Sequence, residues 1–422
     1  MIHYFRKRNV VLKILTVVVF IGIFFLGLWI YLNHTQSSSP TIFEFVVLFI
    51  FVFLTIPWGV LELILLVKNR KLKYKSASKP IVGRKVMINI TTNGGASSVV
   101  NQIIKQMREY STPLKFIVTI EEGDKNGYNA DEEVIVPKNY VTPNHSLYKS
   151  RALHYFSQWL DKNGYGKETY VIHLDDDSMI SEEYVKYVMG MKSDAGQGSL
   201  RLREYGQSTF STLADFGRSY SCDVYCAYGN QIGKPIGVHG EGLVIRADIE
   251  AKIGWDFIGN KLDSEDYLMG QTIVHEGYSF DYIPGGIFIS PPVTTRDFYK
   301  QRRRWMHSFF NSRDYGNKLN KESTTFFTYQ YSMGWTVAFG FTFWMYMLTT
   351  HVMVPIAMDV VFTLAILMSY TGMLYGIIVN KTPKRWIILM IVLLIPVMLY
   401  QSGTFFYTIL CPPKTYDVIR KV

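Results

Sequence analysis

Long apolar runs near both ends of the chain constrain its fold more than any other feature. Five runs exceed the about 20 residues that a helix needs to cross about 30 Å of hydrocarbon. The first run is too long for the core of a secretory signal, and no small-residue cleavage site follows it, so it predicts a membrane anchor. The runs cover residues 10–32, 42–67, 325–350, 353–379 and 386–411.

The basic residues orient these predicted spans. Much of the net charge of +10 lies beside the first two runs, whereas residues 33–40 between them contain no Lys or Arg. The positive-inside rule then places the N-terminus and the segment after 67 in the cytosol. Three later crossings would leave the basic tail outside, against that rule, so two or three helices are expected there. Since the basic residues gather near the spans, nucleic acid is not an expected partner.

Three cysteines, Cys222, Cys226 and Cys411, are too few and too unevenly spaced for a disulfide framework. A single C-x₃-C lacks a second pair of ligands, so zinc is not predicted from the sequence. Reduced thiols without a catalytic role are the expectation, which suits a cytosolic domain.

Between the apolar runs, the composition is that of a soluble α/β domain. Short β-branched runs alternate with helical patterns at Ser97–Tyr110 and Ser146–Leu160, which predicts a largely parallel sheet with ligands at the carboxyl ends of its strands. We expect a membrane region at 1–79, a catalytic domain at 80–323 and a second membrane region at 324–422. The predicted strands are Lys85–Thr91, Lys115–Ile120, Glu133–Val136, Tyr170–Leu174, Gly242–Arg246 and Ser279–Ile283.

Three adjacent carboxylates, Asp175, Asp176 and Asp177, follow the buried-strand pattern 170–174 directly. Adjacent carboxylates repel one another, and a cation that neutralises them makes the crowding tolerable. Hard oxygen ligands suit Mg²⁺ or Mn²⁺, which also bind phosphates. A solvated acidic turn is the alternative, and the position at the end of a strand favours the metal.

Two further clusters carry chemistry. Glu265 and Asp266 precede a helical stretch, where they could cap the helix or supply a general base. Residues 301–305 read Gln-Arg-Arg-Arg-Trp close to the next apolar run. Guanidinium groups match phosphate geometry, and an indole face stacks on a sugar. Lipid phosphate at the membrane surface is the other reading of the arginines.

The order Asp-x-Asp, Glu-Asp, Gln-Arg-x-Arg-Trp between membrane helices resembles membrane-integrated family-2 glycosyltransferases, which include cellulose, chitin and hyaluronan synthases. Within that group the chain is most similar to the egghead-type β-1,4-mannosyltransferases, over about residues 85–310. The sequence departs from the pattern at Asp177, where Glu is expected, and at Gly240-Glu241-Gly242. The most similar stretches are residues 135–140, 147–153, 173–177 and 297–305.

The resemblance implies a GT-A fold and inverting transfer of a sugar by a single displacement. Asp175 and Asp177 would hold Mg²⁺ or Mn²⁺, and Asp266, with Glu265 beside it, would act as the base. His239, Glu241 and Trp305 would contact the acceptor. The donor nucleotide sugar would be bound by Thr91, Thr92, Glu121, Lys149, Arg151, Asp175, Gln301, Arg302 and Arg304.

The leading functional hypothesis is a multi-pass membrane enzyme whose cytosolic domain transfers a hexose to a membrane-associated glycan or glycolipid. The resemblance suggests GDP-mannose as the donor. A processive polysaccharide synthase that exports its own β-linked polymer is the alternative within the class. A transporter or receptor that binds nucleotide sugars without turnover is the alternative from another class, and it leaves Asp266 without a role.

Overall fold

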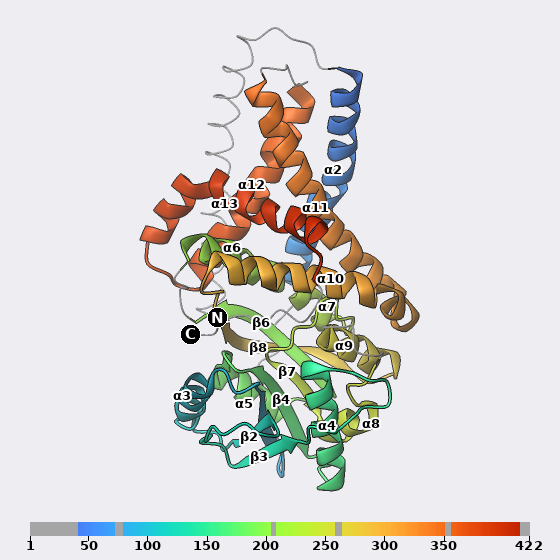
Figure 1. Ribbon diagram of the computed structural model, residues 1–422, viewed down its shortest axis with the longest axis vertical. Coiled ribbons are helices and arrows are strands. Elements are labelled where there is room, and N and C mark those ends of the chain that lie inside the picture. Colours follow the sequence, from blue (N-terminus) through green and yellow to red (C-terminus); the bar gives the residue numbers. More distant parts are fainter. Residues whose placement is uncertain (1–40, 72–78, 204–207, 258–263, 351–355, 414–422) are drawn as a thin grey trace.

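The computed structural model describes residues 41–71, 79–203, 208–257, 264–350 and 356–413. The lower part of the molecule is a sheet flanked by helices, and the upper part is a group of long helices (Figure 1). The first predicted span, 10–32, lies outside the described residues. The two parts meet along α6 and α10, which lie crosswise between them (Figure 1).

One sheet of eight strands has the order β3-β2-β1-β4-β7-β6-β8-β5. The run β3-β2-β1-β4 and the pair β6-β8 are parallel, whereas β7 and β5 are antiparallel to their neighbours, so the sheet is mixed. The strands are β1 Lys85–Thr91, β2 Lys115–Glu121, β3 Glu132–Val136, β4 Thr169–Asp175, β5 Met179–Ile180, β6 Ala195–Leu202, β7 Leu243–Arg246 and β8 Phe280–Ile289.

The predicted strands all exist, with ends that differ by a few residues; β8 is the main exception and continues to Ile289. Every residue of β4 before Asp175 is buried, because helices cover both faces of the parallel part of the sheet. The sequence did not indicate β6, whose pattern Ala-Gly-Gln-Gly-Ser lacks the usual apolar run. Close packing explains its glycines, since a Cβ at Gly196 would lie 2.6 Å from the Asp281 carbonyl oxygen.

Helices cover both faces of the sheet. Val100 and Ile104 of α3 pack into the largest core cluster with Ile88 and Val118 of the sheet. On the opposite face, Phe156 and Leu160 of α4 pack against β1, β2 and β4. The helices of this part are α3 Ser97–Met107, α4 Tyr148–Lys162, α5 Glu182–Gly190, α6 Thr209–Ser221, α7 Ala227–Gln231, α8 Ala247–Ile253 and α9 Glu265–His275, with a π-helical turn at Cys222–Cys226.

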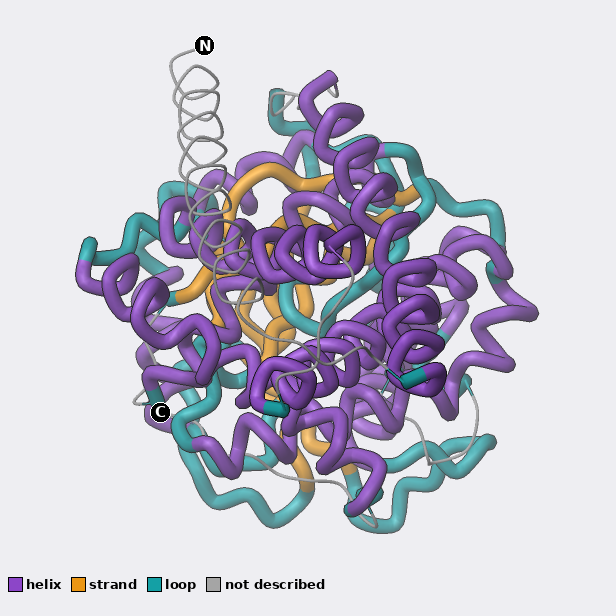
Figure 2. Tube along the Cα trace, turned by 90° about the horizontal axis from the view of Figure 1, so that it is seen from above, coloured by secondary structure: helices purple, strands orange, loops and turns teal. Residues whose placement is uncertain are grey.

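The upper helices are α2 Ile42–Lys71, α10 Thr295–Leu319, α11 Lys321–Thr349, α12 Ile356–Val379 and α13 Arg385–Leu410. Seen from above, helices surround and largely cover the strands (Figure 2). A close approach joins α6 to α12, where a Cβ on Gly376 would lie 2.1 Å from the Phe216 carbonyl oxygen. This contact fixes the upper helices against the layer that carries the cavity described below.

Among the described residues, one helix, Ile42–Asn69, is long and apolar enough to cross a membrane. A second span would require Arg385–Leu393 and Pro396–Leu410 to act together, although they are bent by 65°. The predicted run 42–67 is therefore supported, and the runs 325–350 and 353–379 stay predictions.

Candidate active site

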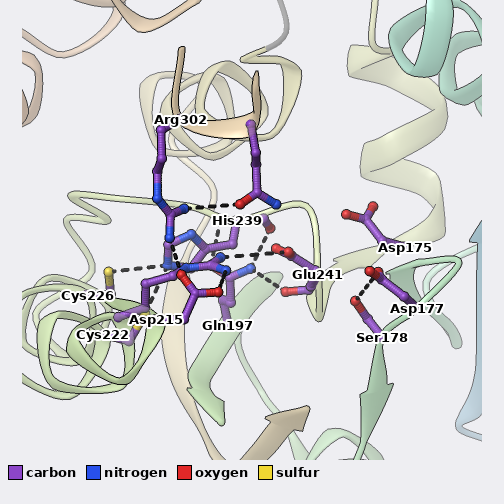
Figure 3. A network of polar contacts seen from close by, with 12 residues as sticks. Asp175, Asp177, Ser178, Gln197, Asp215, Cys222, Cys226, His239, Glu241 and Arg302 are labelled. Atoms are coloured by element: carbon purple, nitrogen blue, oxygen red, sulfur yellow. Dashed lines mark hydrogen bonds and ion pairs between the residues drawn. The ribbon is translucent and has the colours of Figure 1, made fainter. Parts of the chain in front are cut away.

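A cavity of about 1210 Å³ lies between the carboxyl edge of the sheet and the upper helices. Residues from all three chemical motifs line it: the triplet 175–177, the pair Glu265 and Asp266, and Gln301, Arg302, Arg304 and Trp305. Figure 3 shows Asp175 and Asp177 on one side of this region and Asp215 with Arg302 on the other. Motifs that begin at residues 175, 265 and 301 thus share one space.

The aspartate triplet stands where β4 ends. Asp176 is buried and accepts a hydrogen bond from Thr92 Oγ1 at 3.0 Å, which ties the ends of β1 and β4 together. Asp175 and Asp177 are partly exposed and line the cavity on either side of it. Their four carboxylate oxygens are hard donors at a common edge, so the residues fit a Mg²⁺ or Mn²⁺ ion.

Lys149, in the first turn of α4, forms an ion pair with Asp175. Burial alone would lower the pKa of Lys149, but the charges of Asp175, Glu265 and Asp266 raise it above its usual value. This ammonium group is therefore permanently charged and lies among the three carboxylates. The preceding residue, Tyr148, has a φ of +53°, a strained conformation of the kind that is concentrated at functional sites.

Asp266 lies in the first turn of α9, and its Oδ1 accepts a hydrogen bond from the Tyr267 amide at 2.8 Å. Burial, followed by repulsion from Glu265, raises the pKa of Asp266 to about 7, although Lys149 opposes the shift. A Cβ on Gly240 would lie 3.6 Å from both Asp266 Oδ2 and Asp175 Oδ1. The catalytic candidate, the metal candidate and Lys149 therefore all face the space beside one glycine.

The start of α10 fixes the arginine motif. Thr294 accepts a hydrogen bond from the Asp297 amide and donates one to its carboxylate, a capping arrangement that sets where the helix begins. Arg302 then forms an ion pair with Asp215, which is fully buried on α6, and its guanidinium lies 4.4 Å from the Trp305 ring centre.

Trp305 has a second cationic neighbour, since the Arg218 guanidinium lies 4.8 Å from the ring centre. The neighbouring Arg303 does not line the cavity; it donates to the Cys411 carbonyl at 2.8 Å. Arg302 and Arg304 therefore line the cavity, whereas Arg303 takes part in the packing of the helices.

Of the residues near the predicted nucleoside-binding end of the site, some line the cavity and one does not. Thr91, Thr92 and Glu121 line the cavity. Arg151 does not: it pairs with both oxygens of Glu121 at 2.6 Å and donates to the Tyr140 and Pro137 carbonyls. Arg151 therefore holds Glu121 and the loop after β3, and its suggested contact with phosphate has no geometric support.

His239 and Glu241 lie on the loop before β7 and line the cavity. Gln197 of β6 holds this loop through its side chain. Its Oε1 accepts a hydrogen bond from the His239 backbone amide at 2.9 Å, and its Nε2 donates to the carbonyls of His239 and Glu241. The imidazole Nε2 lies 3.1 Å from Cys222 Sγ and 3.6 Å from Cys226 Sγ.

Sequence reasoning missed several residues of this cavity. Asp215 and Arg218 are spaced as an i,i+3 pair on α6, 3.9 Å apart, and Arg218 is also 3.9 Å from Glu241. Their spacing is an ordinary helical one, so only the packing of α6 against α10 shows that Arg218 lines the cavity and that Asp215 pairs with Arg302. Likewise, both cysteines of the C-x₃-C pair line the cavity. From the sequence, they are expected to be thiols without a catalytic role.

Comparison with known proteins supplies the class. The sequence model of glycosyl transferase family group 2 matches residues 170–408, which is more than half of the chain. The chain therefore belongs to this family.

Two relatives share a more particular similarity. Beta-1,4-mannosyltransferase egh of Drosophila melanogaster is 26% identical over 245 residues, 54% of this chain and 52% of that protein. Beta-1,4-mannosyltransferase bre-3 of Caenorhabditis elegans is 26% identical over 181 residues, 41% of this chain and 40% of that protein. The chain thus spans about half the length or less of these relatives, and the similarity agrees with the egghead-type resemblance.

One solved structure, the mannosyltransferase PcManGT from Pyrobaculum calidifontis in complex with GDP-Man and Mn²⁺, superposes with a TM-score of 0.51. It covers 88% of this chain and 99% of that one at 11% identity. At this identity the match shows the fold alone, a GT-A-like α/β domain with a mixed, mostly parallel sheet.

Proposed function

We propose that the chain is a metal-dependent, inverting glycosyltransferase that moves a hexose from a nucleotide sugar to a membrane-associated acceptor. One observation carries the proposal: the aspartate triplet, Asp266 and the arginine-tryptophan motif line one cavity. Burial and Glu265 raise the pKa of Asp266 to about 7 in the same cavity, which supports turnover over binding alone.

In the reaction, Asp266 takes the proton from an acceptor hydroxyl as the oxygen attacks C1 of the donor sugar from the face opposite the leaving group. The bond between C1 and the phosphate oxygen breaks, and its electron pair stays on the nucleoside diphosphate. Lys149, Arg302 and Arg304 are the cations around the cavity that stabilise this negative charge, and Gln301 can donate a hydrogen bond. No covalent intermediate on the protein is required.

Asp175 and Asp177 would hold the Mg²⁺ or Mn²⁺ ion, which neutralises charge on the diphosphate when bound. Lys149 then has to yield part of its ion pair with Asp175. The solved mannosyltransferase structure that shares the fold is in complex with GDP-Man and Mn²⁺, which supports GDP-mannose as the first donor to test.

The shape of the cavity supports an acceptor attached to a membrane. Its lining continues from the carboxylates to the upper helices, where Trp58, Met368 and Met398 contribute. A glycan on a lipid would then reach Asp266 from the bilayer side, with the catalytic domain in the cytosol and the chain crossing the membrane several times. Trp305 and His239 also line the cavity, where the acceptor sugar would bind.

The same extension of the cavity supports the second candidate, a processive synthase that passes its product between its own helices. The two differ in product: a single added sugar for the transferase, and a retained polymer for the synthase. Mass analysis of the product made with a soluble or lipid-linked acceptor separates them.

The decisive experiment incubates the purified full chain with a panel of GDP- and UDP-sugars and measures released nucleoside diphosphate. We expect release from one donor, its loss with EDTA and its return with added Mn²⁺ or Mg²⁺. Binding of a nucleotide sugar without release would instead identify a binding protein, and turnover indifferent to EDTA would remove the metal from the proposal.

A further inference from the structure

Three soft metal-binding groups meet at one wall of the cavity, beside the carboxylates but separate from them. The Sγ atoms of Cys222 and Cys226 and the Nε2 atom of His239 all lie within 4.8 Å of one another. Both cysteines are buried, and the histidine is partly buried (Figure 3). The mechanism proposed above has no use for either thiol.

The two thiols come from one unusual turn. Residues 222–226 form a single π-helical turn between α6 and α7, closed by a hydrogen bond from the Ala227 amide to the Cys222 carbonyl. Side chains four residues apart lie on the same face of a helix, so both sulfurs point toward the same loop. Single π-helical turns occur frequently at functional sites.

The imidazole comes from a separate element that is held in place independently. The side-chain amide of Gln197 contacts the backbone of His239 at both its amide and its carbonyl group. It also donates to the Glu241 carbonyl at 2.9 Å. The three groups are therefore positioned by two elements that a bound ion would connect.

We propose that Cys222, Cys226 and His239 bind a zinc ion, with the fourth coordination position open to the cavity. Bond lengths of about 2.3 Å to sulfur and 2.0 Å to nitrogen in a tetrahedral site place the ligand atoms about 3.5–3.8 Å apart. The contacts of 3.1 and 3.6 Å from Nε2 to the two sulfurs need adjustments of only a few tenths of an ångström.

The donor set also selects the metal. Thiolates and imidazole suit zinc, whereas Mg²⁺ and Mn²⁺ prefer the oxygens of Asp175 and Asp177. Two thiolates cancel the charge of the dication, so the site adds no net charge beside the partly buried Arg218 and Glu241. One chain thus carries two metal sites of different chemistry on the same cavity.

The zinc site would position the loop before β7, which carries His239, Gly240 and Glu241. Gly240 follows His239 directly, and a Cβ there would lie 3.6 Å from Asp266 Oδ2 and Asp175 Oδ1. Fixing His239 to the π-helical turn therefore fixes the backbone at Gly240, beside which both carboxylates lie. Neither the ion nor its ligands need to touch the reacting atoms for this role.

Metal analysis of the purified full chain tests the proposal without relying on activity. After removal of metals and dialysis against zinc, we expect about one bound zinc per chain for the wild type and close to none for Cys222→Ser, Cys226→Ser and His239→Ala. Cys411→Ser should keep its zinc, because Cys411 is exposed and distant from the turn in sequence. Asp175→Asn should also keep it, which separates this site from the metal of the carboxylates.

A wild-type chain without zinc, or a Cys222→Ser variant with a full equivalent, would overturn the proposal. If the variants fail to fold, the wild type alone decides. Cobalt in place of zinc should give the absorption of tetrahedral thiolate coordination, and zinc should protect Cys222 and Cys226, but not Cys411, from alkylation. A disulfide between Cys222 and Cys226 in the metal-free protein with no zinc uptake after reduction would contradict it. The metal content is independent of sugar transfer, so failure of either proposal leaves the other standing.

Discussion

Asp266 is the single residue on which the proposed chemistry depends most. Replacing it with Asn keeps the size and the hydrogen bond from the Tyr267 amide but removes the proton acceptor. We expect Asp266→Asn to reduce transfer by on the order of 10²–10⁴-fold while donor affinity persists. Single-turnover assays with labelled donor, together with equilibrium binding, measure both quantities.

The matched control for that variant is Asp314→Asn, because Asp314 is exposed on α10. Its turnover should equal that of the wild type. Normal turnover of Asp266→Asn would remove this residue from the role of base and direct attention to Glu265.

The surroundings of Asp266 also predict the pH dependence. Burial and Glu265 raise its pKa to about 7, while the charge of Lys149 and the hydrogen bond from the Tyr267 amide oppose the shift. Since the base acts only when deprotonated, kcat/KM should fall as the pH drops below about 7, approaching about tenfold per pH unit. A flat profile between pH 5 and 8, with donor binding unchanged, would contradict the assignment.

A buried ion pair links α6 to α10 beside the proposed binding site of the leaving group. Asp215 of α6 is fully buried and pairs with Arg302 of α10, with Arg218 at 3.9 Å. Removing one partner of a buried pair leaves a charge uncompensated, which costs about 3–5 kcal/mol. Asp215→Ala should therefore lower the melting temperature markedly and weaken donor turnover, as measured by thermal unfolding in detergent and by diphosphate release.

The Lys234–Glu322 ion pair is the control for the buried Asp215–Arg302 pair, because both of its side chains are more than half exposed. Glu322→Gln should leave the melting temperature and the turnover unchanged because solvent screens such pairs. Equal losses in the two variants would mean that the link from α6 to α10 has no special importance.

At the scale of the whole molecule, the cavity joins the α/β domain to long helices, of which one among the described residues is apolar enough to cross a membrane. Ile42–Asn69 is apolar enough to span, and large side chains of α2 such as Phe43 and Phe53 are exposed on the isolated chain. We expect the protein to stay in the membrane pellet after extraction with alkaline carbonate and to dissolve in detergent. Release by carbonate alone would show a peripheral attachment and would weaken the proposed acceptor route.

Much of this architecture could be read from the sequence for a definite physical reason. A strand buried on both faces, such as Tyr170–Leu174, carries a nearly continuous apolar run, here interrupted only by His173, and its end is marked where charged residues begin. The alternation of such runs with helical patterns predicted an α/β sheet. The antiparallel direction of β7 could not be read, because its local sequence is equally suited to either direction.

The sequence by itself determined which chemical groups are present: a carboxylate triplet at a strand end, an acidic pair at a helix start and a cationic-aromatic run beside apolar segments. Only the tertiary structure decided which of them work together. It turned Arg151 toward Glu121, paired Arg302 with Asp215, and brought His239 to the two thiols of a turn that had no visible partner in sequence. The physical reason is that strand and helix patterns depend on near neighbours, whereas a site depends on contacts between residues far apart in the chain.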